Sequence, residues 1–345
     1  QAVPETCAAV GKAPCLPTPD GRLPANVEVD GREKLLHDWT DNWQPRFGLA
    51  YRLTDRTALR GSFGMFFDSW AGVTQTTQNL GHTWPDVGRR LSGNLNQPNT
   101  AQPVPTVSAK NPFPSATLPS PTPFNDGAYF VDPYFKNSYS LQWNLGVQHQ
   151  LSSSSVLSLN YVGSGNRRLP LGGFYNVALT PGPGNPALRR PFPYITPTNW
   201  DRSWGRSNYN ALQAQFRRTF ARGFTMMVNY TWSKAISIGC DGFFGVEGCA
   251  VQDPYNFNLE RSVAGHDLTH ILNLSWVWEL PFGRGRWLAT GSRVVDYVLG
   301  GWQFNGIATF HSGQPYTINM SGDVANTGNQ TGYMRPNVVG TADLD

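Results

Sequence analysis

Large apolar residues alternate with small polar residues in the segment "FTMMVNYTWSK". Every second position carries a large apolar side chain: Phe224, Met226, Val228, Tyr230 and Trp232. The positions between them are small or polar, and almost none carries a charge. Because successive side chains of a β-strand point to opposite faces, this spacing predicts a strand with one apolar and one uncharged polar face.

The same alternation recurs in four pairs of segments, which we interpret as four β-hairpins. The pairs are "RFGLAYRLTDRTALRGSFGMFFD", "SYSLQWNLGVQHQLSSSSVLSLNYVGS", "NALQAQFRRTFARGFTMMVNYTWSK", and "LTHILNLSWVWELPFG" with "GWQFNGIATFHSG". Short turns are expected at Thr54–Arg56, Ser152–Ser155 and Ala221–Gly223. The fourth connection, Pro281–Gly300, is longer, and its "SRVVDYVLGG" predicts a short helix.

The connections between hairpins are long and rich in Gly, Pro, Asn and Ser. They cover residues 69–137, 163–207 and 237–267, and a further such segment, 312–345, follows the last strand. Short turns alternating with long loops are typical of outer-membrane barrels. The pattern therefore predicts an all-β, antiparallel up-and-down transmembrane β-barrel. Its expected parts are an extracellular segment at 1–42, barrel strands in four hairpins at 43–311, and an extracellular segment at 312–345.

The two faces of the predicted strands differ in chemistry. We expect the larger apolar side chains to meet lipid: Leu49, Tyr51, Phe63, Trp143, Leu145, Phe216, Val228, Tyr230, Trp232, Leu274 and Trp276. We expect the opposite face to line the lumen: Arg46, Arg52, Arg60, Gln142, Asn144, Gln213, Gln215, Arg217, Asn229 and Glu279. An Arg or Lys on the lipid face near the midplane would destabilise a barrel by about 2–4 kcal/mol. The polar set fits either contact with a plug and a polar solute, or plain hydration of an inner wall.

Composition supports a barrel over a soluble fold. Charged residues are only 14% of the chain, while aromatic residues are 13%. A large soluble β-sandwich with the aromatic face as its core is the alternative, but it would leave a weakly charged outer surface. The net charge of +4 is too small and too scattered for a nucleic-acid footprint. No uninterrupted apolar run approaches the roughly 20 residues of a spanning helix, and mean hydropathy is −0.38.

Several longer motifs resemble the barrel of TonB-dependent outer-membrane receptors, most closely the Oar-like branch. They are "WQPRFGLAYRLTDRTALRGSFGMFFD", "YSLQWNLGVQHQLSSSSVLSLNYVGSGNRRLP", "YNALQAQFRRTFARGFTMMVNYTWSKAI", "QDPYNFNLERSVAGHDLTHILNLSWVWELPFGRGR", "GGWQFNGIATFHSGQPYTI" and "GDVANTGNQTGYMRPNVVG". The resemblance covers residues from about 43 to 340, with the motifs in the family's order.

The resemblance implies more than the alternation does: a barrel of about 22 strands around a plug, energised through TonB in the bacterial outer membrane. The chain shows no plug, no TonB box and no initiator Met, and it stops at "GTADLD". We therefore expect a fragment with about eight strands of the larger barrel. Its expected partners are outer-membrane lipid and a transported ligand that the sequence does not identify.

Candidate chemistry is sparse. His266 and His270 have the spacing of a helical metal pair, but on a strand four residues span roughly 13 Å, so we favour a strand entrance. Acidic residues suitable for Ca²⁺ fit no EF-hand spacing, and we interpret them as solvated loop charges: Asp241, Glu247, Asp253 and Glu260. No nucleophile elbow or phosphate-binding glycine loop appears. We therefore expect no enzyme activity, no catalytic or metal-binding residues and no cofactor.

Four cysteines permit three pairings. Because each pair lies within one expected extracellular segment and the periplasm is oxidising, we predict the disulfides Cys7–Cys15 and Cys240–Cys249. Free thiols or a link between the two loops are the alternatives.

The expected function is to bind and move a solute, or to pass a protein, across the outer membrane. A passive porin-like barrel and a soluble surface adhesin or carbohydrate-binding β protein are the alternatives.

Overall fold

A computed structural model describes the greater part of the chain. The described residues are 37–68, 129–171, 174–191, 197–221, 223–238, 251–283, 286, 288, 292–329, 334–337 and 339–340. The four cysteines and the loop carboxylates Asp241 and Glu247 lie outside these ranges.

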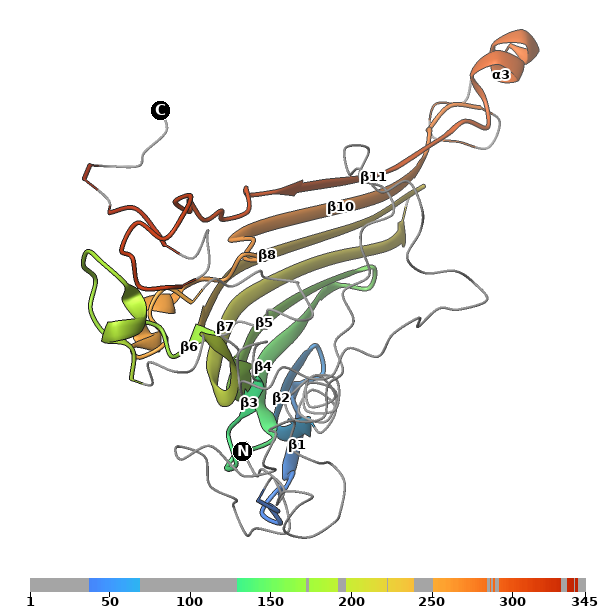
Figure 1. The fold of residues 1–345 in the computed structure, drawn as a ribbon. Helices are drawn as coiled ribbons and strands as arrows, with labels where there is room; N and C mark the ends of the chain where they lie inside the picture. The colour runs from blue at the N-terminus through green and yellow to red at the C-terminus, as the bar shows by residue number, and fades with distance from the viewer. Residues whose placement is uncertain are drawn as a thin grey trace, which may run out of the picture.

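The structure is one curved antiparallel sheet in which consecutive strands of a single path are hydrogen-bonded (Figure 1). The strands of the path are β1 (Arg46–Thr54), β2 (Thr57–Asp68), β4 (Ser138–Ser152), β5 (Ser155–Leu171), β7 (Thr198–Ala221), β8 (Phe224–Ile238), β10 (His270–Glu279) and β11 (Gln303–His311). β1 and β11 are the two edges, so the described strands form an open trough rather than a closed barrel. The eight predicted strands and their antiparallel, up-and-down order are confirmed.

Short elements accompany these strands. β3 (Tyr129–Val131) and β6 (Phe174–Tyr175) pair with β7, and β9 (Ser262–Val263) pairs with β8. Two 3-10 turns, η1 (Pro186–Arg189) and η2 (Phe257–Glu260), lie in the long connections. The predicted helix is confirmed as α3 (Arg293–Leu299) between β10 and β11. Among the described residues, no helix is long and apolar enough to cross a membrane.

The predicted turns are confirmed, but the prediction of loop over residues 163–207 was wrong at both ends. β5 continues to Leu171 and β7 begins at Thr198. At about 3.3 Å per residue, the 24 residues of β7 span about 80 Å, far beyond the 9–11 residues that cross a bilayer. Alternation did not reveal these extensions because the parts nearest the predicted strands, residues 164–168 and 205–208, carry polar residues or glycine on both faces. Ladder pairs such as Gly165 with Asn208 and Arg167 with Arg206 nevertheless continue the sheet.

The described parts of the later long connections lie together at one end of the sheet, and α3 lies at the other (Figure 1). We call the segments 174–191, 251–261, 323–329 and 334–337 the loop cluster. Its backbone is joined across large sequence distances, as where the Ala178 N–H donates to the Thr327 carbonyl at 2.7 Å. Leu171 and Val251 are almost fully buried at this end, with Phe257 packed against them. Many large apolar side chains on the strands are exposed instead, so the core lies in the loop cluster.

Candidate functional site: the two faces of the sheet

Ladder pairing places all ten predicted lumen residues on one face of the sheet, which we call the polar face. Partners that lie directly opposite each other in a ladder point to the same face. One row of such partners crosses every strand of the path: Arg52, Ala58, Gln148, Ser158, Gln215, Asn229, Asn273 and Thr309. Seven of these eight side chains are polar. Alternation along each strand places the remaining predicted lumen residues on the same face, although that they line a lumen stays a prediction.

Amide and hydroxyl side chains connect neighbouring strands on the polar face. The Gln215 side-chain amide donates to Asn229 Oδ1 at 2.7 Å, between β7 and β8. Asn144 Nδ2 donates to Ser62 Oγ between β4 and β2, and Thr309 Oγ1 donates to Asn273 Oδ1 at 2.9 Å between β11 and β10. These groups satisfy one another in part and leave further donors and acceptors for water or a solute.

A hollow of about 350 Å³ lies on the polar face across the middle strands. Its lining includes Arg60, Asn160, Gln213, Gln215 and Asn229, and no carboxylate contributes to it. Glu279, the acidic member of the predicted set, lies at the end of β10, where its carboxylate is 2.6 Å from the Arg286 guanidinium. The centre of the polar face is therefore weakly positive and rich in amides. Such a surface hydrogen-bonds polar groups without strong charge selection.

All eleven predicted lipid-contacting residues share the opposite face, the apolar face. Direct partners include Phe216 with Val228 and Val228 with Leu274. Two indole rings lie where the facing strand has glycine, Trp143 over Gly163 and Trp276 over Gly306. A side chain at either glycine would displace the ring.

The apolar face has no second layer against it. Within the described ranges the strands form one sheet path, and no second sheet packs on this face. Leu49 and Trp232 remain 59% and 55% exposed. The soluble sandwich with an aromatic core, kept open as an alternative, is therefore not the structure of these residues. What covers this face stays a prediction.

The apolar band crosses the sheet obliquely. One row of direct partners runs Gly61, Leu145, Tyr161, Leu212, Trp232 and His270, from β2 to β10. On β2, Phe63, Met65 and Phe67 lie on the loop side of this row. On β10, the large apolar residues of 272–278 all lie on its turn side.

This displacement gives the inclination of the strands to the band. The centre of the band shifts by roughly seven residues, or about 23 Å, over five inter-strand steps of about 4.8 Å each. The strands are thus inclined by about 45° to the normal of the band. Barrel strands tilt by about 35–45°, so a level slab of apolar solvent would match the band.

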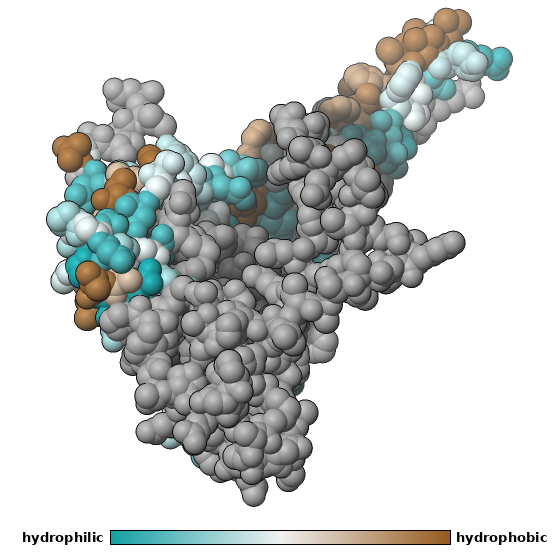
Figure 2. All heavy atoms as spheres, viewed as in Figure 1, coloured by the Kyte–Doolittle hydropathy of each residue, from teal (hydrophilic) through white to brown (hydrophobic). Residues whose placement is uncertain are grey.

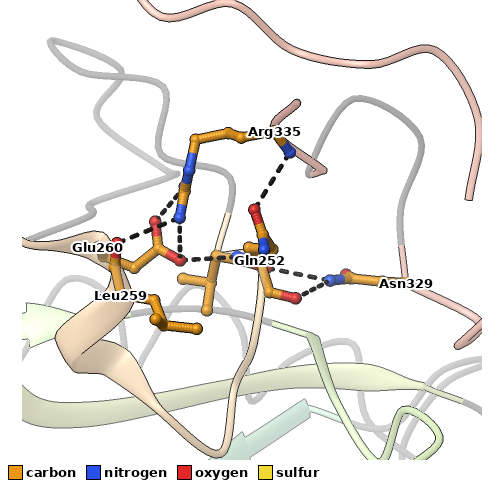
Figure 3. A network of polar contacts seen from close by, with 6 residues as sticks. Gln252, Leu259, Glu260, Asn329 and Arg335 are labelled. Atoms are coloured by element: carbon orange, nitrogen blue, oxygen red, sulfur yellow. Dashed lines mark hydrogen bonds and ion pairs between the residues drawn. The ribbon is translucent and has the colours of Figure 1, made fainter. Parts of the chain in front are cut away.

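A buried ion pair in the loop cluster was not predicted (Figure 3). Arg335 Nη1 lies 2.5 Å from Glu260 Oε2, and the carboxylate also accepts from the Gln252 N–H at 2.9 Å. The backbone N–H of Arg335 donates to the Gln252 side chain, and Asn329 Nδ2 donates to the carbonyl of Gln252 at 3.1 Å. Glu260 is only 8% exposed, so its interpretation as a solvated loop charge was wrong. The cause is a partner 75 residues away, which no local pattern reveals.

Other groups join segments of the loop cluster to one another and to β7, where Arg202 Nη2 donates to the Pro254 carbonyl at 3.2 Å. The Tyr255 hydroxyl donates to the Val177 carbonyl at 2.8 Å, and burial, with Tyr175 and Asp253 nearby, raises the pKa of Tyr255. Arg202 is buried with its guanidinium 4.5 Å from the ring centre of Trp204. Burial lowers the pKa of Arg202 to about 10, so it remains charged at neutral pH.

Asp267 anchors the entrance to β10. Burial alone would raise its pKa, but hydrogen bonds from the Ala235 N–H at 2.7 Å, the Lys234 ammonium and the Thr269 hydroxyl outweigh burial and hold the pKa below its usual value.

His266 precedes the entrance to β10 and His270 begins this strand, as expected. Asp253 accepts from the Tyr255 N–H in a turn. Among the described residues, no group of three or more His, Cys, Asp or Glu could hold a metal ion.

Comparison with known structures gives weak fold similarity. The ferric enterobactin receptor PfeA of Pseudomonas aeruginosa, in mutant form, aligns at 13% identity and TM-score 0.36 over 69% of this chain and 26% of its own. The siderophore receptor PirA of Acinetobacter baumannii aligns at 14% identity and TM-score 0.34, over 69% of this chain and 27% of PirA. The ferric-catecholate import receptor Fiu of E. coli K12 aligns at 11% identity and TM-score 0.32, over 68% of this chain and 22% of Fiu.

The chain spans about a quarter of the length of these structures. A search of curated protein sequences finds no match. The profile of one family, described as "Outer membrane beta barrel domain", matches residues 11–345. The chain therefore belongs to the outer membrane beta barrel domain family and is a protein of the outer membrane.

Proposed function

We propose that the chain forms part of the barrel wall of a TonB-dependent receptor that binds a solute, or passes a protein, across the outer membrane. The observation that carries this proposal is the division of one sheet into two continuous faces. The apolar face follows an oblique band that fits lipid around strands tilted by about 45°. The polar face, from Arg52 to Thr309, then lines the inside of the barrel.

The open curvature of the sheet supports a wide barrel. Eight strands that closed on themselves would leave an interior that side chains fill, whereas these eight leave β1 and β11 as separate edges. Further strands are needed for closure, and the larger lumen could hold a plug or a solute. The amide groups and Arg60 of the hollow would contact that content. The role is binding and transfer, with no covalent step.

TonB and a plug domain are the partners that the sequence resemblance implies for the whole protein. A passive porin-like barrel is the competing function, because its inner wall would also be polar. A surface adhesin is less consistent, since aromatic residues that bind sugars would not need to form one oblique band across six strands.

The complete gene product, expressed in outer membranes, distinguishes these functions. We would measure uptake of a panel of ferric siderophores, oligosaccharides and peptides in matched strains with and without TonB, and conductance in planar bilayers. A receptor gives TonB-dependent uptake of at least one solute and little resting conductance. Steady conductance together with uptake that is equal in both strains would establish a porin and refute the proposal.

A further inference from the structure

The connection between β10 and β11 carries an unpartnered apolar surface. Its helix, α3, is seven residues long, or about 10 Å, and projects beyond the turn end of the sheet (Figure 1). Figure 2 shows hydrophobic residues gathered on this projection. Tyr297 is 92% exposed and Val294 is 73% exposed. Residues this apolar are rarely left in water together.

The helix is amphipathic. At about 100° per residue, the five apolar residues form one broad side centred on Val298, and Arg293 and Asp296 occupy the remaining side. On the apolar side, Val294, Tyr297 and Val298 are each more than half exposed. The exposed Arg293 gives the polar side a cation that suits anionic lipid phosphates.

This apolar side continues the apolar face of the sheet. The Leu280 N–H donates to the Trp302 carbonyl at 2.9 Å and so extends the β10–β11 ladder by one step toward α3. By alternation, Leu280 and Trp302 fall on the same face as Trp278 and Phe304. The Trp302 indole N–H donates to the Val298 carbonyl at 2.8 Å, which holds the ring against the end of the helix. Trp302 therefore links the apolar face of the strands to the end of α3.

We propose that α3 and Trp302 form an interfacial anchor that lies in the headgroup region of the membrane at the turn end of the barrel. The occupant of the apolar side is the lipid surface itself. Tyr and Trp favour this depth because their rings are apolar and their polar atoms stay hydrated. Short amphipathic helices bind in this plane with basic residues toward the headgroups. The anchor would fix the depth of the β10–β11 connection in the membrane. This proposal rests on the proposed lipid contact of the apolar face.

The test uses an environment-sensitive NBD fluorophore at single cysteines in the complete gene product, with all native cysteines replaced by serine. Three labelled variants are compared: Val298→Cys on the apolar side of α3, Arg293→Cys on its polar side, and Leu274→Cys on the apolar face of β10. The proteins are inserted in vesicles of phosphatidylethanolamine and phosphatidylglycerol, with and without brominated acyl chains. Blue-shifted emission and bromine quenching report contact with acyl chains.

We expect quenching at Val298 to be at least about twofold stronger than at Arg293, with Leu274 quenched as well. Quenching at Leu274 with water-like emission at Val298 would overturn the anchor and leave the lipid-facing strand assignment intact. Blue-shifted emission at Val298 without bromine quenching would show a protein partner, such as a second copy of the chain, and would also overturn it. Absence of quenching at all three sites would refute the membrane orientation on which both proposals rest.

Discussion

Val228 on β8 lies directly opposite Leu274 on β10, and the next pair in this antiparallel ladder is Asn229 with Asn273. The first pair belongs to the apolar face and the second to the polar face. Neighbouring positions on the same strand therefore offer a matched test of which face meets lipid.

Val228→Arg should prevent assembly into detergent-resistant barrels, whereas Asn229→Arg should be tolerated. A guanidinium at lipid depth destabilises a barrel by about 2–4 kcal/mol, while a hydrated lumen accepts it. Heat-modifiable mobility on SDS gels measures assembly. Leu274→Arg and Ser275→Arg repeat the comparison on β10. Equal damage from both members of each pair would contradict the assignment of the faces.

A peptide tag inserted at Gly184 should be reachable by antibody on intact cells, and one at Ser153 should not. Gly184 lies in the loop cluster, with open space around it, whereas Ser153 lies in the two-residue turn between β4 and β5. Long loops face outward and short turns face the periplasm in outer-membrane barrels. A tag at Asn94, outside the described residues, should also be reachable. Surface labelling at Ser153 alone would reverse the orientation.

Glu260→Gln should loosen the loop cluster. The substitution leaves Arg335 without its charged partner, and loss of one member of a buried pair destabilises by about 3–5 kcal/mol. Hydrogen exchange of residues 251–261 should accelerate strongly at neutral pH. Arg52→Gln is the control, because its 3.5 Å ion pair with Asp55 is exposed and contributes little. Unchanged exchange in Glu260→Gln would show that other contacts hold these loops together.

The junction of β8 with β10 should weaken in acid. The pKa of Asp267 is lowered in the folded protein, so its contribution is fully present above the unfolded pKa of about 3.9 and is lost as pH falls through the lower folded value. Exchange of the Ala235 amide, which Asp267 holds, should therefore accelerate in acid beyond the intrinsic trend. In Asp267→Asn this excess acceleration should disappear, with faster exchange already at pH 7. Identical pH profiles of both proteins would exclude Asp267 as the group responsible.

Non-reducing peptide mapping should recover Cys7 linked to Cys15 and Cys240 linked to Cys249. Each bond would close a small loop and contribute on the order of 2–3 kcal/mol by restricting the unfolded chain. A peptide that joins Cys7 to Cys240, or Cys15 to Cys249, would refute the local pairing. Thiols that alkylate fully in the native protein would exclude both disulfides.

Alternation predicted the eight strands of the path and the composition of their faces because it is a local property. A residue such as Val228 reaches the apolar face by its parity within β8, whatever lies beside it. Where both faces are polar, parity carries no signal. The extensions of β5 and β7 around Arg167 and Arg206 were missed for this reason, although ladder hydrogen bonds form there as readily.

The sequence by itself determined which side chains share a face, where the tight turns lie, and that α3 is a helix, because these depend on neighbours a few residues away. The tertiary structure decided the register, and the register turned separate apolar segments into one oblique band. It also decided which loops meet. Glu260 and Arg335 are 75 residues apart, and their pairing depends on strand ends that the whole sheet brings together.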